Sequence, residues 1–507
     1  MKKLKWIHRW FSLFAGILLI LWAASGIILN HRNSVSALSI KRSLLPSDYQ
    51  YDNWNNAAIR SACHWRGDSI LVYGNVGIWL TDHDFRSFEP MMKGLPGGID
   101  PLRTMKIVNT SQHDVYAATQ SGLYQLSFGK QDWKKIDVAS HDTRVVDLVV
   151  KNDTLFVMNR SKIYLIDILN DNKIIKTIDL KPAHNDDGKI GLFRTLWVIH
   201  SGEILGFIGK LFVDFLALIL VFLVLTGYVW FFFPRWMKKR KSKGLTSTNQ
   251  KKWTSFLIRW HNKLGIWLGA FLVVTVLTGI FLRPPLLIAI ANSRVAKIPF
   301  SVLDQPNTWE DKLRALLFDD ETKQWYIGTN EGIYTVNESF SQRPKVVENL
   351  PPVSVMGINV FEKLENSNFL IGSFNGLFVW NAESGESFDF LTGKEVEARS
   401  SVASPIGKNL ISGLIINEGD FLVFDYNKGL LGNEVAMPDK IKATPMPLWN
   451  LALEIHTARI FEPFIGPFYL LIIPLLGLIT LLILISGIVI YLRPKKKKVL
   501  TKALPES

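Results

Sequence analysis

The sequence predicts a membrane protein: a four-transmembrane-helix bundle made of two tandem repeats, with a β-rich, propeller-like extracytoplasmic domain formed by two inserted segments. Three observations predict this fold class. Four stretches of about twenty or more residues carry almost no charge, which is the length a helix needs to cross a bilayer, and the mean hydropathy of the 507 residues is +0.16. The third apolar stretch repeats the first, and two long polar segments contain short apolar runs separated by turn residues.

The four apolar stretches set the expected topology. They cover about 10–30, 212–233, 264–282 and 464–492. Segments 1–9, 235–259 and 493–507 together hold 19 Lys and Arg residues and one acidic residue, a surplus of 18 in a chain whose net charge is +14. Because basic residues beside spans mark the cytoplasmic side, both termini and the central loop are expected there. The rest of the chain is slightly acidic, which excludes nucleic-acid binding.

The expected organisation follows from this topology. It comprises a cytoplasmic start and first span (1–31), an extracytoplasmic β-rich segment (32–200), a second span (201–234), a basic cytoplasmic loop (235–256), a third span (257–284), a second extracytoplasmic β-rich segment (285–456), a fourth span (457–492) and a basic cytoplasmic tail (493–507). A cleaved signal peptide is the alternative for the first span, since 23–26 imitates a cleavage site. The apolar run is long for a signal peptide and its repeat is internal, which favours a span.

The two halves of the chain repeat each other. Aligning His8 with His261 superposes the glycines of spans one and three without a gap, and His200 matches His456 ahead of spans two and four. Each repeat contains two spans, so both copies enter the membrane with the same orientation. The expected symmetry axis is therefore parallel to the membrane normal.

The two polar segments are expected to form β-hairpins. Short runs such as 69–73, 114–118, 324–327 and 369–371 are each followed by a Gly, Asn or Ser turn and then by a second short run. Successive hairpins are roughly forty residues apart, which is the spacing of propeller blades, and each segment holds about three such units. One propeller assembled from both segments is predicted; two separate sandwiches are the alternative.

Five of the ten histidines lie at the ends of spans. They are His8 and His261 on the cytoplasmic side, and His31, His200 and His456 on the outer side. Ionisable residues at membrane depth are costly and indicate function, and neutral imidazole is a common axial ligand of haem iron. The repeat pairs the two cytoplasmic histidines with each other and His200 with His456, which predicts two b-type haems near opposite membrane faces. His31, whose counterpart is Pro284, is either a replacement outer ligand or a polar residue at the domain junction.

Interfacial anchoring, as for Trp and Tyr, is the alternative for these histidines. Lys210 and Asp214 are four residues apart and can pair on one helix face; a snorkelling or exposed helix end is the favoured interpretation over a proton path. A single cysteine, Cys63, excludes a disulfide framework and a thiolate metal cluster. No dinucleotide fingerprint, Ser/His/Asp arrangement or metalloprotease signature occurs, so NAD(P)H or flavin would have to bind a partner.

One sequence pattern resembles a known family. The pattern consists of His8-Arg-Trp followed by the apolar run to Ser25-Gly26 and Leu29-Asn-His31, and it is repeated from Arg259-Trp-His261 to Leu277-Thr-Gly279. It resembles the PepSY-associated transmembrane helix family. Members of that family are bacterial inner-membrane proteins, and some are haem-containing reductases of ferric siderophores. The resemblance implies that His8, His31, His200, His261 and His456 are ligand candidates. No PepSY segment is recognisable in the polar regions.

Two functions are compatible with these features. The first is a b-type cytochrome reductase that passes electrons from a cytoplasmic donor or quinone to an acceptor outside, such as a ferric siderophore or other chelated iron. The second is a non-enzymatic, membrane-anchored β-propeller that senses or binds a ligand. The paired histidines favour the first, and the hairpins favour the second.

The expected topology has a direct test. Reporter fusions after residues 120, 245 and 380 should read outside, inside and outside, because the basic residues cluster in three short segments. An inside signal at residue 120 would overturn the topology and the side assigned to each histidine.

Overall fold

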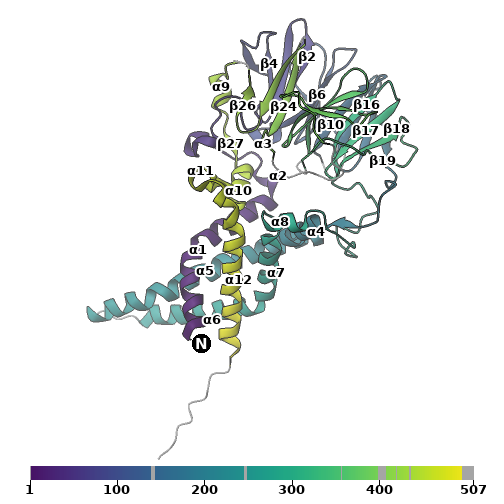
Figure 1. The fold of residues 1–507 in the computed structure, drawn as a ribbon. Helices are drawn as coiled ribbons and strands as arrows, with labels where there is room; N and C mark the ends of the chain where they lie inside the picture. The colour runs from purple at the N-terminus through teal and green to yellow at the C-terminus, as the bar shows by residue number, and fades with distance from the viewer. Residues whose placement is uncertain are drawn as a thin grey trace, which may run out of the picture. The chain divides into compact units, whose positions relative to one another are not determined.

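The computed structural model describes residues 2–138, 143–244, 248–354, 357–397, 407–417, 419–432 and 435–493 (Figure 1). The chain divides into two compact units. A helical unit comprises Met1–Arg32, Lys189–Asp304 and Leu451–Ser507, and a β-rich unit comprises Asn33–Gly188 and Gln305–Asn450. Residues 189–200 and 285–304, which were expected in the polar segments, thus group with the helices.

Three helices of the described chain are long and apolar enough to cross a membrane. They are α1 (Lys2–Asn30), α5 (Gly206–Ser242) and α12 (Tyr469–Leu492). The predicted third span is not a single straight helix, because α6 (Thr248–Trp267) and α7 (Gly269–Ile280) meet at a bend of 63°. Gly269 opens α7, and glycine is a common residue at a helix kink. These two helices reach the length of a span only as a pair.

Short elements lead into the long helices. They include α4 (Leu192–Ser201), the 3-10 turn η3 (Glu203–Leu205), α8 (Leu286–Ile290), α10 (Leu448–His456), α11 (Glu462–Ile465) and the strand pair β14 (Ile190–Gly191) and β15 (Arg294–Val295). The helix α4 ends in a left-handed residue, Gly202 (φ 79°), and the corresponding residue after α10 is Ala458 (φ 61°). Both helices therefore end with the same turn two residues after a histidine.

The first polar segment forms three antiparallel sheets. Their strands are β2 (Ser61–Arg66), β3 (Ser69–Gly74), β4 (Gly77–Thr81) and β5 (Phe88–Pro90); β6 (Thr104–Asn109), β7 (Val115–Thr119), β8 (Gly122–Leu126) and β9 (Lys134–Ile136); and β10 (Val145–Lys151), β11 (Thr154–Asn159), β12 (Ile163–Asp167) and β13 (Lys173–Ile178). Each sheet follows chain order, so successive strands form hairpins. A two-residue turn before Gly77 (φ 88°) joins β3 to β4.

The second polar segment repeats this pattern. Its strands are β16 (Leu313–Asp319), β17 (Gln324–Thr329), β18 (Ile333–Asn337) and β19 (Lys345–Val346); β20 (Ile358–Lys363), β21 (Asn368–Ser373), β22 (Gly376–Asn381) and β23 (Ser387–Asp389); and β24 (Ile411–Asn417), β25 (Asp420–Asp425) and β26 (Gly429–Leu431). Further short elements are β1 (Ser39–Ile40), which pairs with β27 (Met446–Pro447), and the helices α3 (Ile99–Leu102) and α9 (Asp439–Lys442). The predicted β-rich character of both segments is confirmed.

Neighbouring sheets pack against each other in a cyclic order. The first strand of each sheet lies beside the first strand of the next: β2 by β6, β6 by β10, β10 by β16, β16 by β20, β20 by β24, and β24 again by β2. Six clusters of buried apolar side chains in the described chain each combine residues from two neighbouring sheets. The apolar core is thus divided among the six gaps between sheets.

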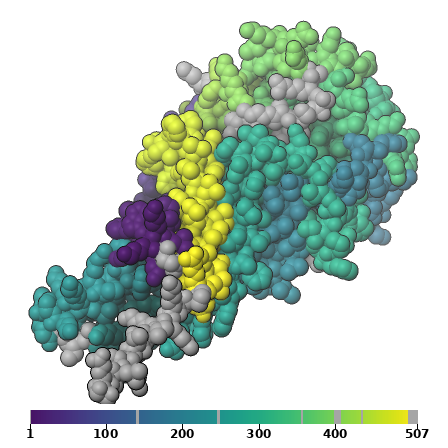
Figure 2. Space-filling view, turned by 60° about the horizontal axis from the view of Figure 1, so that its bottom comes forward, coloured from purple at the N-terminus to yellow at the C-terminus, as the bar shows by residue number. Residues whose placement is uncertain are grey.

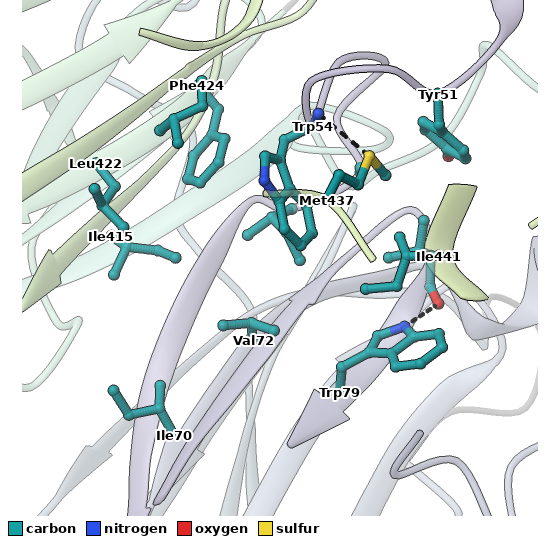
Figure 3. Packing of buried hydrophobic residues seen from close by; sticks show 14 residues of the cluster. Tyr51, Trp54, Ile70, Val72, Trp79, Ile415, Leu422, Phe424, Met437 and Ile441 are labelled. Carbon is teal, nitrogen blue, oxygen red and sulfur yellow. Dashed lines mark hydrogen bonds between the residues drawn. The ribbon is translucent and has the colours of Figure 1, made fainter. Parts of the chain in front are cut away.

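Two of these gaps join the first polar segment to the second. Between β10 and β16, a carboxylate oxygen of Asp147 accepts a hydrogen bond from the backbone N–H of Leu316 at 2.7 Å. Between β24 and β2, the backbone N–H of Leu414 donates to the carbonyl oxygen of Arg60 at 2.8 Å. Side chains from both segments fill this second gap, with Trp54 facing the residues of β25 (Figure 3). Neither segment can therefore bury its apolar surface alone.

A glycine substitution tests the gap between β24 and β2. A Cβ atom at Gly413 would lie 2.3 Å from the carbonyl oxygen of Arg60, whereas at Gly97 it would meet nothing within 4 Å. We expect Gly413→Ala to lower the free energy of unfolding by about 1–3 kcal/mol and Gly97→Ala to change it by about 0.5 kcal/mol or less. Urea denaturation followed by tryptophan fluorescence measures both. Equal effects of the two variants would contradict the close approach.

Candidate functional site

Two pairs of histidines meet in the helical unit. The imidazole ring centroids of His8 on α1 and His261 on α6 are 6.4 Å apart. Those of His200, in the last turn of α4, and His456, in the last turn of α10, are 6.0 Å apart. The structure brings together the two pairs that the sequence repeat had matched.

Each histidine of the first pair is held by a facing helix. Nδ1 of His8 lies 3.0 Å from the carbonyl oxygen of Ile483 and 3.1 Å from the hydroxyl of Ser486, both on α12. Nδ1 of His261 lies 2.8 Å from the hydroxyl of Thr226 on α5. In the sequence repeat α5 and α12 correspond, so the two contacts are equivalent.

The second pair is held in a similar way. Nδ1 of His456 lies 3.1 Å from the carbonyl oxygen of Trp22 and 3.0 Å from the hydroxyl of Ser25, both on α1. Nδ1 of His200 lies 2.8 Å from the carbonyl oxygen of Thr275 on α7. Here too the two facing helices correspond in the repeat, because α7 belongs to the stretch that repeats α1.

Each facing helix presents a hydroxyl residue followed by glycine. These dipeptides are Ser25-Gly26, Thr226-Gly227, Thr278-Gly279 and Ser486-Gly487. In all four the hydroxyl donates to the carbonyl oxygen three residues earlier, at 2.9–3.1 Å. An added Cβ would lie 2.7 Å from Cε1 of His200 at Gly279, and 3.0 Å from Cε1 of His8 at Gly487. We call this dipeptide, together with the carbonyl three residues before its hydroxyl residue, the histidine cradle.

The hydrogen bonds of the cradle determine which ring nitrogen is free. A carbonyl oxygen can only accept, so Nδ1 of His8, His200 and His456 carries the proton and donates it. Each Nε2 then keeps its lone pair. Within the described chain no hydrogen bond reaches Nε2 of any of the four paired histidines. A metal-ligating histidine is oriented in this way by a donor bond from its other nitrogen.

The spacing of each pair fits a metal between two imidazoles. Two imidazoles that bind one metal through bonds of about 2.0 Å have ring centroids roughly 6 Å apart. The ring centroids of the two pairs are 6.4 Å and 6.0 Å apart. No group of three or more His, Cys, Asp or Glu side chains that could bind a bare metal ion occurs among the described residues. Two protein ligands fit a haem, whose macrocycle supplies the remaining four.

The two pairs lie at different levels of the helical unit. The helix α1 carries His8 near its start and the cradle of His456, at Ser25, near its end. Seventeen helical residues rise about 26 Å. The pairs therefore form two separate sites and not one cluster.

His31 belongs to neither pair. Its Nε2 lies 2.6 Å from one carboxylate oxygen of Asp214, and the side-chain amide of Asn30 donates to the other oxygen at 2.8 Å. Asp214 is 9% exposed, so this contact gives a buried carboxylate two partners. Because Nε2 of His31 is engaged, we do not include His31 among the ligands proposed below.

Lys210 and Asp214, which helical spacing would allow to pair, have other partners. Nζ of Lys210 lies 3.3 Å from one carboxylate oxygen of Glu203. The other oxygen accepts a hydrogen bond from the guanidinium of Arg194 at 2.9 Å. The turn η3 places Glu203 beside the start of α5, so Lys210 reaches back to it, while Asp214 faces α1. Helical spacing alone does not reveal this turn.

The hydroxyl groups of the cradles were not predicted from the sequence. A signal was nevertheless present, because each apolar stretch contains one Ser-Gly or Thr-Gly dipeptide. The repeat drew attention to the glycines, and the residue before each glycine carries the hydroxyl. Helical Ser and Thr commonly bond to a carbonyl of the preceding turn, which makes them easy to dismiss.

Comparisons with known proteins find several weakly similar structures and one family. No curated protein matches the chain. Similar solved structures include the extracellular domains of a putative one-component system and of a putative hybrid two-component system, both from B. thetaiotaomicron, and the computationally designed Ika8 protein; identities are 13%, 10% and 9%, and TM-scores 0.36, 0.35 and 0.32. The matches cover 74%, 74% and 75% of this chain, and 32%, 39% and 98% of those chains. The chain thus spans about a third of the first domain, and likenesses this weak assign no function.

The family comparison covers the whole region that contains the histidine pairs. The model of the PepSY-associated TM region matches residues 5–494. This range includes both repeats and all four cradles, and it confirms the resemblance seen at His8-Arg-Trp and its echo before His261. The chain belongs to the family of the PepSY-associated TM region.

Proposed function

We propose that the protein is a haem-containing transmembrane electron-transfer protein that reduces an acceptor outside the cytoplasm. In this proposal His8 and His261 hold one b-type haem, and His200 and His456 hold the other. The observation that carries it is the pair geometry: in both pairs the rings are about 6 Å apart and each Nδ1 is bonded to a facing helix.

The protein's own residues would prepare both sites before a cofactor binds. The cradle bonds fix the direction of each imidazole and keep the Nε2 lone pair available. Gly279 and Gly487 leave room for the ring edges of His200 and His8, and apolar helices surround both pairs. Bound haem would supply one-electron chemistry. Hydrogen bonding at Nδ1 and burial are the means by which the protein would set each potential.

Helix contacts support a four-helix bundle as the scaffold of the two sites. The helix α1 contacts α5 and α12, α12 contacts α6 and α7, and α5 contacts α6 and α7. This closed order fits four spans, with the bent pair α6–α7 as the third. The predicted topology would then place the His8 pair near the cytoplasmic face and the His200 pair near the outer face of a bacterial inner membrane.

The β-rich unit is proposed to be a six-bladed propeller on the outer side. Support comes from the cyclic order of its six sheets, in which β24 lies beside β2, and from the division of its core among the gaps between sheets. Closure into a ring protects strand edges that an open arrangement would expose. The neighbouring strands β24 and β2 come from different polar segments, which favours one propeller over two sandwiches.

The electron acceptor is proposed from the family and not from the site geometry. A ferric siderophore, or other chelated iron, is the acceptor that the family resemblance implies. The donor would be quinol in the membrane or a cytoplasmic reductase, because the sequence contains no nucleotide fingerprint of its own. In either case electrons would enter at one pair and leave at the other.

A non-enzymatic binding or sensing protein is the second candidate. The observation that favours it is the size of the β-rich unit, which takes in most of the two polar segments. The two functions differ in what the helical unit contains. Only the first requires a chromophore.

The haem proposal predicts a specific absorption spectrum. Protein purified from haem-replete cells should show b-type bands after dithionite reduction, with about two haems per chain, one for each pair. His8→Ala or His456→Ala should remove or convert one haem and spare the other, because the sites are separate. His113→Ala, an exposed residue of the β-rich unit, is the control and should keep both. A colourless wild-type protein would refute the redox function and leave the binding protein as the better explanation.

A second prediction concerns the cradle of His261. Thr226→Val keeps the shape of the side chain but removes the hydroxyl that accepts from Nδ1. We expect the midpoint potential of one haem to shift in a potentiometric titration, while the other haem is unchanged. Thr254→Val is the matched control, because Thr254, on α6, is buried like Thr226 but its hydroxyl bonds to the carbonyl of Gln250 and to no histidine among the described residues. Identical titrations for wild type and Thr226→Val would show that the cradle does not tune the site.

A further inference from the structure

Charge is distributed very unevenly in the helical unit. The carboxylates of its described residues all lie close in sequence or space to the His200 and His456 pair: Glu203, Asp214, Asp304, Glu454 and Glu462. The opposite end, with His8 and His261, has none. No Asp or Glu occurs in 1–47 or in 215–303, whereas 235–263 alone holds ten Lys and Arg residues. Cations at this end therefore have no carboxylate partner within the described helical unit.

These cations lie on a helical hairpin that extends past the spans. The 37 residues of α5 rise about 55 Å, well beyond the roughly 30 Å of a bilayer core. The helix α6 contacts α5 and joins α7 at 63°, so α6 does not continue the direction of the span. The two helices run side by side (Figure 1), and their teal atoms form a projection at the lower left of Figure 2. We call residues 231–244 and 248–267 the basic hairpin.

The guanidinium groups near this end have unused hydrogen-bonding capacity. Nε of Arg240 and Nε of Arg9 are buried and have no hydrogen-bond partner among the described residues. Arg240 stacks over Trp236, with 4.9 Å from its guanidinium carbon to the ring centroid, and Arg9 stacks over Phe231 at 4.6 Å. Stacking satisfies the apolar face of a guanidinium and leaves its N–H groups free for an anion.

Exposed tryptophans accompany the positive charges. Trp236, Trp253 and Trp267 are 42%, 65% and 61% exposed. Nζ of Lys263 lies 5.3 Å and 5.8 Å from the ring centroids of Trp260 and Trp267. Tryptophan concentrates at the level of lipid headgroups, and helices that combine a basic face with such rings lie in the membrane interface.

We propose that the basic hairpin lies on the membrane surface and binds the phosphate groups of anionic phospholipids. Lipid is favoured over an acidic protein partner because α5 and α7 continue from the hairpin into the spans, which keeps its tryptophans and cations at the headgroup level. Several cations on one short hairpin would recognise an anionic leaflet in preference to a zwitterionic one. The proposal does not depend on haem.

Reconstitution of the full chain in lipid nanodiscs tests this proposal. The melting temperature is measured in phosphatidylcholine alone and in phosphatidylcholine mixed with phosphatidylglycerol. Wild type should melt several degrees higher in the mixed lipid, and high salt should reduce the difference. A variant with Lys238→Gln, Lys239→Gln and Lys241→Gln should melt like wild type in phosphatidylcholine, which shows that it folds, and should lose the increase.

A control variant removes the same charge elsewhere. Lys134→Gln, Lys135→Gln and Lys176→Gln alter exposed positions of the β-rich unit and should keep the full lipid effect. Inorganic phosphate added to phosphatidylcholine discs should not reproduce the increase. A wild type indifferent to phosphatidylglycerol, an equal loss in both variants, or an equal effect of free phosphate would each overturn the proposal.

Discussion

The hydrogen bond from a histidine Nδ1 to a facing helix is the interaction on which the helical unit depends. It occurs four times, and each time it joins an imidazole to a different helix of the unit. A buried imidazole without a partner would be costly, so each bond fixes the register between two helices as well as the ring. The same bond leaves Nε2 available. Packing and the proposed chemistry therefore rest on one set of contacts, and at Gly279 and Gly487 the rings of His200 and His8 pass so closely that a side chain would crowd them.

The repeat makes the exceptions to symmetry informative. Both halves contain the cradles and the left-handed turn after the second histidine, at Gly202 and Ala458. Only the first half contains the contact between His31 and Asp214, since Pro284 occupies the position of His31 in the second half. A feature needed to hold the bundle would be expected in both halves. This contact thus distinguishes one side of the outer histidine pair from the other, and it engages Nε2 of a histidine that the sequence alone made a ligand candidate.

Much of this arrangement could be predicted from the sequence, and the remainder depends on tertiary contacts. Apolar length and basic flanks located the membrane helices, and the repeat matched His8 with His261. The bend between α6 and α7 was missed because the apolar run continues through it without interruption. The contact of Lys210 with Glu203 was not predicted, because it depends on the turn η3, which packs against α5. The hydroxyls of the cradles belong to Ser-Gly and Thr-Gly dipeptides that are visible in the sequence. Their role becomes apparent only when a second helix brings an imidazole to them.

The most direct test of the central claim is the electron paramagnetic resonance spectrum of the oxidised protein in membranes. If each iron lies between two imidazoles, both axial positions are filled and the account predicts low-spin ferric haem at two distinct sites. The two signals should differ, because the cradles offer different hydrogen bonds to the four rings. High-spin ferric haem, a single site, or the absence of any haem signal would contradict the account.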